Sequence, residues 1–417
     1  MGNSGICPDH ANIGRFIALH DDLIAGPFFE ALTRSVLRET GSAGECLAGD
    51  GTVVEAAASH YGLLKVEAAQ QKAEDAQRQA QDDPDDLDKQ GRAEQAQRVH
   101  HTLERRSQRR QARGKSSGQL RISPQEPDAL VQPLKRGRGM APAYKPSILA
   151  NESRVVVGHV VDPSNEVAVL PGLLTQSRKV TGAMPGELLL DAGYWADAVI
   201  ETSLTHDISL LCPEGRTGGK RSAGSRLYPK SDFCYSEFDD SYRCPAGARM
   251  VVIGRWAGNE KSPAYTLYGT PACNGCEHRA QCTRNKKGRR LKRYDGDEAK
   301  EALRQVMCHP KAKRRFSRRP AMVEPVFSVM RGLQGLNRFR RKGLAAVRTE
   351  FALHVLAYNL GRALACRLFV APFSGHTVVL ALLKQYFAHH QFIAMMMNIN
   401  NPNPGKVAHA ELNLLLA

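Results

Sequence analysis

The sequence predicts a mixed α/β protein, because short apolar runs of strand length alternate with longer segments of helical periodicity. Runs such as Leu188-Leu189-Leu190 have the length of strands, and Gly and Pro residues lie between them. Residues 323–369 instead show a long helical pattern. With 417 residues, of which 42% are hydrophobic, the chain can build a sizeable core in one or two domains and still carry insertions.

The charge of the chain favours a polyanionic partner. Lys and Arg number 58 against 42 Asp and Glu, a formal net charge of +16. Such an excess favours nucleic acid before an anionic membrane, although a solvated basic surface is an equally good explanation of net charge alone. No secretion-signal pattern opens the chain, and the most apolar stretch, residues 364–383, is interrupted by Arg367 and Pro372. We therefore expect a cytoplasmic protein without a membrane partner.

The first 119 residues divide into a helical leader, the start of a core and an insertion. Residues 1–45 form the leader, which ends in a helix over Ala25 to Thr40 with Gly41 as its stop. Residues 46–64 begin the core with a strand that contains Asp50 and continues to Val54. Residues 65–119 are polar and predict an exposed helical hairpin, broken near Asp83-Pro84. The dense Arg run at residues 105–113 either tracks phosphates or forms a solvated helix face.

The rest of the core lies in two further segments, residues 120–212 and 311–370. Strand signals at 154–161, 187–191 and 208–212 predict a mixed sheet, and helices dominate from residue 323 to 369. Between the two segments, residues 213–310 are rich in Gly, Lys, Arg and Cys and predict a basic, Cys-containing insertion. The C-terminal tail, residues 371–417, is assigned no element.

Three carboxylates stand out within this scheme. Asp50 and Asp191 follow the apolar runs of two predicted strands, and Glu324 stands at the start of an amphipathic helix. Two Mg²⁺ ions can activate an oxygen nucleophile, neutralise a phosphate and stabilise the leaving oxygen. Because Mg²⁺ takes hard oxygen ligands and keeps several waters, three convergent carboxylates are enough to hold the pair.

The segments around these carboxylates resemble the bacterial insertion-sequence transposases of the DDE type. Asp50-Gly51-Thr52 and Asp191-Ala192-Gly193-Tyr194 are similar to the first two motifs of that family. Glu324-Pro325-Val326-Phe327, with the later Lys342-Gly343-Leu344 and Tyr358-Asn359-Leu360, resembles the closing segment. The resemblance implies an RNase H-like core: a mixed sheet flanked by helices and interrupted by the helical and the Cys-containing insertions.

The resemblance also implies roles for residues and partners. Asp50, Asp191 and Glu324 would be the catalytic, metal-binding triad for two Mg²⁺ ions, and Asp128 competes for the first position. The activity would be cleavage and strand transfer at the ends of an insertion sequence in double-stranded DNA, by a homo-oligomer assembled on that DNA. Arg331 replaces the usual Lys of the family and either grips a phosphate or forms a structural ion pair. The residues that would hold DNA are Arg318, Arg319, Arg331, Arg338, Arg340, Arg341 and Lys342.

Departures from the family pattern leave a second hypothesis open. Lys145, Ser147 and Ser328 stand where the family has other residues, and Pro8-Asp9-His10 looks like the end of a DNA-binding region whose remainder is absent. The alternative is therefore a catalytically inactive, truncated transposase remnant that only binds DNA. A nuclease on the same core, which cuts DNA without joining it, is a third hypothesis.

The cysteines of the second insertion suggest a metal site. Cys273, Cys276 and Cys282 form a Cys-x2-Cys-x5-Cys run, and Cys244 can supply a fourth thiolate. Four thiolates make a closed tetrahedral Zn²⁺ site. A structural Zn²⁺ and reduced free thiols are equally good interpretations of the spacing, whereas a disulfide framework is not expected in a chain without a secretion signal.

Overall fold

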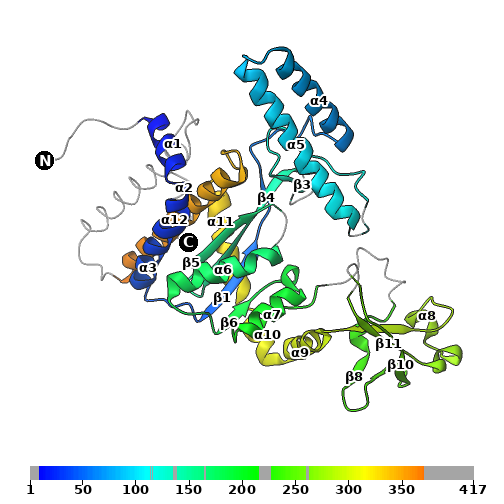
Figure 1. Cartoon of the computed structure of the whole chain (residues 1–417). Coiled ribbons are helices and arrows are strands. Elements are labelled where there is room, and N and C mark those ends of the chain that lie inside the picture. Colours follow the sequence, from blue (N-terminus) through cyan, green and yellow to red (C-terminus); the bar gives the residue numbers. More distant parts are fainter. Residues whose placement is uncertain are drawn as a thin grey trace.

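The computed structural model describes residues 9–112, 114, 116–134, 139–163, 166–215, 227–259 and 263–370. The predicted tail at 371–417 and the first residues of the predicted leader lie outside this range. Figure 1 shows a central sheet with helices around it, a helical hairpin at one side and a second sheet at another. The chain is therefore a mixed α/β protein, as the sequence predicts.

The central sheet is mixed. Its main strands lie in the order β5-β4-β1-β6-β7, in which β4 pairs antiparallel with β5 and β1, while β1, β6 and β7 run parallel. Two short strands, β2 and β3, pair with the first half of β4. The bounds are β1 Cys46–Gly51, β2 Val54–Glu55, β3 Leu130–Pro133, β4 Met140–Asn151, β5 Val156–Asp162, β6 Glu187–Leu189 and β7 Ser209–Leu211.

Two details of this sheet differ from the prediction. The strand around Asp50 stops at Gly51 and resumes only at Val54. The Thr52 amide still donates to the carbonyl of Pro146, but proline has no amide to donate in return. Strand β4, which lies in the middle of the sheet, was not predicted as a strand. It contains Pro142 and Pro146, and proline normally argues against a central strand.

Helices pack against the sheet and close one large core. Helix α6 packs on β5 and β4, α11 packs on β1 and β4, and α12 packs on β5 and along α3. Side chains from the sheet and from the helices, such as Leu47, Leu188 and Phe351, are fully buried in this core. The bounds are α1 His10–Leu19, α2 Asp21–Leu23, η1 Ile24–Phe28, α3 Phe29–Thr40, α6 Glu166–Thr181, α7 Asp197–Thr205, α9 Asp297–Cys308, α10 Pro310–Phe316, α11 Arg319–Gly332 and α12 Leu344–Val370.

The helical hairpin lies where the sequence predicts it. Helices α4 (Val66–Asp82) and α5 (Leu87–Ala112) pack on each other and extend away from the sheet (Figure 1). The break falls at the predicted Asp83-Pro84. A small separate cluster that includes Leu64, Val99 and Leu103 anchors the hairpin at its base. The hairpin is thus an addition to the core, with its own few apolar contacts.

The Cys-containing region forms a second, antiparallel sheet in strand order. Its bounds are β8 Cys234–Ser236, β9 Ser241–Arg243, β10 Arg249–Trp256, β11 Tyr265–Gly269 and β12 Arg290–Tyr294, with η4 Lys230–Asp232, η5 Pro271–Gly275 and α8 Arg279–Cys282 beside them. The last part of the predicted insertion behaves differently. Helix α9 packs on β7 and α7, and its Leu303 belongs to the main core.

None of the helices in the described part of the chain combines the length and the apolar character needed to cross a membrane.

Candidate active site

Asp50 and Asp191 lie at the same edge of the central sheet. Strands β1 and β6 are parallel neighbours, with Ala48 opposite Leu189. Asp50 lies two residues after Ala48, and Asp191 lies two residues after Leu189. Neighbouring strands lie about 4.8 Å apart, and ligands of open α/β sheets bind at the carboxyl ends of the strands. The register therefore places two carboxylates, 141 positions apart in sequence, side by side where a ligand can reach them.

The turn after β6 fixes the orientation of Asp191. Its Oδ1 accepts a hydrogen bond from the amide of Gly193 at 2.9 Å and so caps the short η3 turn, Ala192–Tyr194. The neighbouring Cys212 thiol donates to the Asp191 carbonyl at 3.1 Å. Burial and the nearby Asp191 raise the pKa of Cys212 to about 12, so this cysteine stays a protonated packing residue. The second oxygen, Oδ2, faces Arg319.

Arg319, at the start of α11, joins the two carboxylates. One of its terminal nitrogens is 3.0 Å from Asp50 Oδ1 and 3.6 Å from Asp191 Oδ2. The guanidinium also donates two hydrogen bonds to the carbonyl of Gly49, at 2.8 and 3.1 Å. Arg319 is 8% exposed. It is therefore part of the candidate site itself and not the surface DNA contact that the sequence predicts.

Glu324 lies five residues further along α11 and is exposed. A separation of seven residues places Arg331 on the same side of this helix, and Arg331 donates to the Thr52 hydroxyl and, at 3.0 Å, to the Val53 carbonyl. The helix thus holds both sides of the Asp50 segment. Among the described residues, however, no three His, Cys, Asp or Glu side chains lie close enough together to hold a metal ion.

Asp128, the competing first carboxylate, lies elsewhere. It pairs with Arg98 of α5 at 3.0 Å, and its Oδ2 accepts from the amide of Leu344 at the start of α12 at 3.2 Å. These contacts join the hairpin to α12 and give the Asp128 carboxylate a structural role. Because the pairing of β1 with β6 places Asp50 next to Asp191, Asp50 is the better candidate for the first carboxylate of the site.

Several of the other residues predicted to contact DNA also make contacts within the chain. Arg338 donates to the carbonyls of Ala56 and Ala58, and Arg341 donates to the carbonyl of Gly14, so both tie the segment after α11 to other parts of the chain. Arg318 pairs with Glu187 at 3.0 Å and with Glu152 at 2.5 Å. Of the residues predicted to contact DNA, four are exposed: Arg318, Arg338, Arg340 and Lys342.

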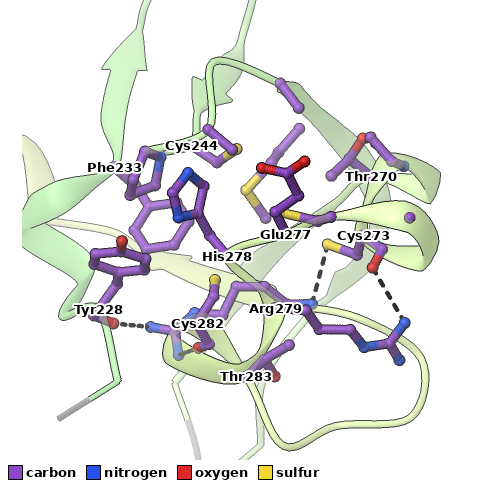
Figure 2. Close-up of a pocket in the computed structure, with 18 residues that line it drawn as sticks. Tyr228, Phe233, Cys244, Thr270, Cys273, Glu277, His278, Arg279, Cys282 and Thr283 are labelled. Atoms are coloured by element: carbon purple, nitrogen blue, oxygen red, sulfur yellow. Dashed lines mark hydrogen bonds between the residues drawn. The ribbon is translucent and has the colours of Figure 1, made fainter.

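The four cysteines of the second sheet share one pocket. Cys244, Cys273, Cys276 and Cys282 line a pocket of about 390 Å³ together with His278. Figure 2 shows Cys244, Cys273 and Cys282 around this pocket. Burial raises the pKa of Cys282, and the three other cysteines are near enough to raise it further. The thiols do not converge closely enough to hold a metal as they stand, and all four are free.

Comparison with known families gives a match over residues 243–364, to a model described as a transposase DDE domain. This part of the chain is similar to a transposase DDE domain. The matched range includes Glu324, the four cysteines of the pocket and most of α12, and it leaves Asp50 and Asp191 outside. Comparison with curated proteins and with solved structures gave no match.

The match confirms the resemblance to DDE-type transposases drawn from the sequence. The matched range includes Glu324 on α11, while Asp50 lies on β1 and Asp191 directly follows the end of β6, both outside that range. Sequence reasoning missed the role of Arg319 between these carboxylates. In the sequence, Arg319 is marked only by its position five residues before Glu324. That position does not predict contacts with Asp191 and Asp50, which lie about 130 and 270 residues earlier in the chain.

Proposed function

We propose that the protein is a DNA transposase that catalyses metal-dependent cleavage and strand transfer at the ends of an insertion sequence. The observation that carries this proposal is the shared register of Asp50 and Asp191, with both carboxylates beside the same guanidinium of Arg319. The DDE-domain match around Glu324 supports it independently. The mixed sheet with helices packed on it supports an RNase H-like description of the core.

The carboxylates fit a hard divalent cation. Asp50 and Asp191 offer oxygen donors at adjacent strand ends, their side chains are 20% and 42% exposed, and they already attract one positive charge. Asp50, Asp191 and Glu324 would hold two Mg²⁺ ions. When bound, the ions supply activation of the attacking oxygen and neutralisation of the phosphate. The residues of the chain orient the carboxylates: Gly193 fixes one oxygen of Asp191, and α11, which carries Glu324, packs on β1.

Exposed basic residues beside the site would hold the DNA backbone. Arg340 and Lys342 are exposed, and the amides of Arg340 and Arg341 both donate to Glu350, which fixes this segment at the base of α12. Contacts with phosphates position a duplex without reading its sequence. Assembly as a homo-oligomer on DNA stays a prediction from the family resemblance.

We further propose that the cysteine pocket binds a structural Zn²⁺. The second sheet has a small core, with five buried residues in its cluster, and small units of this kind commonly need a metal or disulfides for stability. The amide of Arg289 donates to Cys273 Sγ at 3.4 Å, and such a bond stabilises a thiolate. Binding would draw the four thiols toward one centre.

The catalytic proposal is tested by cleavage of a duplex that carries the terminal sequence flanking the gene, with and without Mg²⁺. Glu324→Gln keeps the size of the side chain and removes the negative charge, so cleavage should fall by at least 100-fold. Glu67→Gln, an exposed change on α4, is the matched control and should cut normally. Binding without cleavage by the unmodified protein would instead favour the inactive remnant, and cleavage without strand transfer would favour the nuclease.

The zinc proposal is tested by the metal content of protein purified without a chelator. We expect about one Zn²⁺ per chain in the unmodified protein and in Cys234→Ser, which changes an exposed cysteine of β8 outside the pocket. Cys276→Ser should lose the metal. Metal-free protein with four reactive thiols would overturn the zinc proposal and leave the catalytic one untouched.

A further inference from the structure

Arg319 occupies the place between the two strand-end carboxylates. Two carboxylates at adjacent strand ends repel each other, and a cation between them removes that repulsion. The structure puts an internal cation there, 3.0 Å from Asp50 and 3.6 Å from Asp191. The two carboxylates therefore have a counter-ion that belongs to the chain.

The chain holds this guanidinium in place from behind. Two donors of Arg319 converge on the carbonyl of Gly49, the residue before Asp50. A Cβ at Gly49 would lie 2.4 Å from Leu190 Cδ2, so a larger residue here would force that side chain to move. The Gly49 carbonyl keeps the Arg319 side chain beside both carboxylates. The arrangement is buried, since the Arg319 side chain is only 10% exposed.

We propose that Arg319 is a built-in counter-ion that competes with divalent cations for Asp50 and Asp191, and so sets the metal concentration at which the site becomes loaded. This inference rests on the proposed function, because it takes those two residues as metal ligands. A divalent cation has to displace or share the guanidinium, which raises the concentration it needs. Without metal, the same guanidinium keeps the two strand ends from repelling each other.

A second arginine next to it provides a control. Arg318 precedes Arg319 and also bridges two carboxylates, Glu187 and Glu152. Glu187 is additionally paired with Arg315 at 2.7 Å, so loss of Arg318 leaves it with a partner. Arg318 and Arg319 therefore make similar ion pairs in neighbouring positions, but only Arg319 contacts the candidate metal ligands among the contacts described for the two.

The test is a calorimetric titration of the full chain with Mn²⁺, without DNA. Arg319→Gln removes the charge and keeps a donor for the Gly49 carbonyl, so its dissociation constant for Mn²⁺ should fall at least fivefold. Arg319→Lys keeps the charge and should bind Mn²⁺ within about twofold of the unmodified protein. Arg318→Gln should also leave Mn²⁺ binding unchanged, and Asp50→Asn should remove most of it. Circular dichroism on each variant checks that the chain is folded.

Each outcome decides something. Tighter Mn²⁺ binding by Arg319→Gln alone supports the counter-ion role. Equal affinity in Arg319→Gln and the unmodified protein, with binding still lost in Asp50→Asn, overturns it and leaves the proposed function standing. Weaker binding by Arg319→Gln would mean that Arg319 builds the site instead of competing for it, which also overturns the inference. No Mn²⁺ binding by the unmodified protein would defeat the metal-dependent function as well.

Discussion

Replacing His159 with Leu is expected to reduce the loss of stability of the core in acid. His159 lies on β5 and is 6% exposed. Its ring stacks edge-on against Phe29 of α3 at 4.5 Å and against Phe351 of α12 at 5.9 Å. Its Nε2 has no hydrogen-bond partner within the described structure. The imidazole therefore packs between aromatic rings where the helices of the core meet the sheet, and it keeps a hydrogen bond with the backbone of Ala25 that offsets part of the effect of burial on its pKa.

The size of the effect follows from the pKa. Burial lowers the pKa of His159 from 6.5 to about 4. In the unfolded chain the His159 imidazole binds a proton below about pH 6.5, whereas in the folded chain it binds one only near pH 4. Stability is present above pH 6.5 and is lost as the pH falls toward 4. At roughly 1.36 kcal/mol per pH unit, His159 should remove about 3 kcal/mol of the unfolding free energy between pH 7 and pH 4.

Urea unfolding followed by circular dichroism at several pH values between 7 and 4 measures this effect. Relative to the unmodified protein, the His159→Leu variant should gain about 3 kcal/mol of unfolding free energy between pH 7 and pH 4, whatever the difference between the two proteins at pH 7. His354, whose pKa burial lowers to about 3, remains in both proteins and cancels in the comparison. Parallel pH curves for the two proteins would refute the assignment of a buried neutral imidazole to His159.

Three further predictions concern the site and its support. Asp191→Asn should abolish Mg²⁺-dependent cleavage while leaving affinity for duplex DNA within about twofold, because it removes a candidate metal ligand and no basic group; loss of DNA binding in a gel-shift assay would contradict this. Gly158→Ala should lower thermal stability, since its Cβ would lie 2.8 Å from a backbone carbonyl oxygen of α6, and an unchanged melting temperature would show that the helix can move away. Glu350→Ala removes the acceptor for the amides of Arg340 and Arg341, so DNA affinity in the same gel-shift assay should fall severalfold, and unchanged affinity would show that this segment does not contact DNA.

Local patterns in the sequence were enough to predict several elements. The polar composition and the Asp83-Pro84 break predicted two helices that the structure places at residues 66–82 and 87–112. Gly41 was predicted to end a helix, and it does so with a φ of 59°, a conformation that glycine adopts readily. Such features depend on residues close together in the chain, and so the sequence alone determines them.

Strand β4 shows where local patterns are not sufficient. Its two prolines argue against a central strand, yet it pairs with both β1 and β5. The reason is tertiary: neighbouring strands supply partners for the remaining backbone groups, and the burial of residues such as Tyr144 and Ile148 outweighs the missing amide donors.

The candidate site also has features that the sequence predicted and features that only the tertiary structure revealed. The sequence by itself determined which carboxylates to consider, because each lies in or directly after a recognisable local element and carries neighbours that resemble a DDE transposase motif. The structure differs in one detail, since α11 begins at Arg319 and Glu324 lies inside the helix, not at its start. Only the tertiary structure decided that Asp50 rather than Asp128 lies beside Asp191, and that Arg319 lies between the two carboxylates. Strand register brings Asp191 beside Asp50, and helix packing adds Arg319, which is 269 positions from Asp50, so spacing along the chain does not predict these contacts.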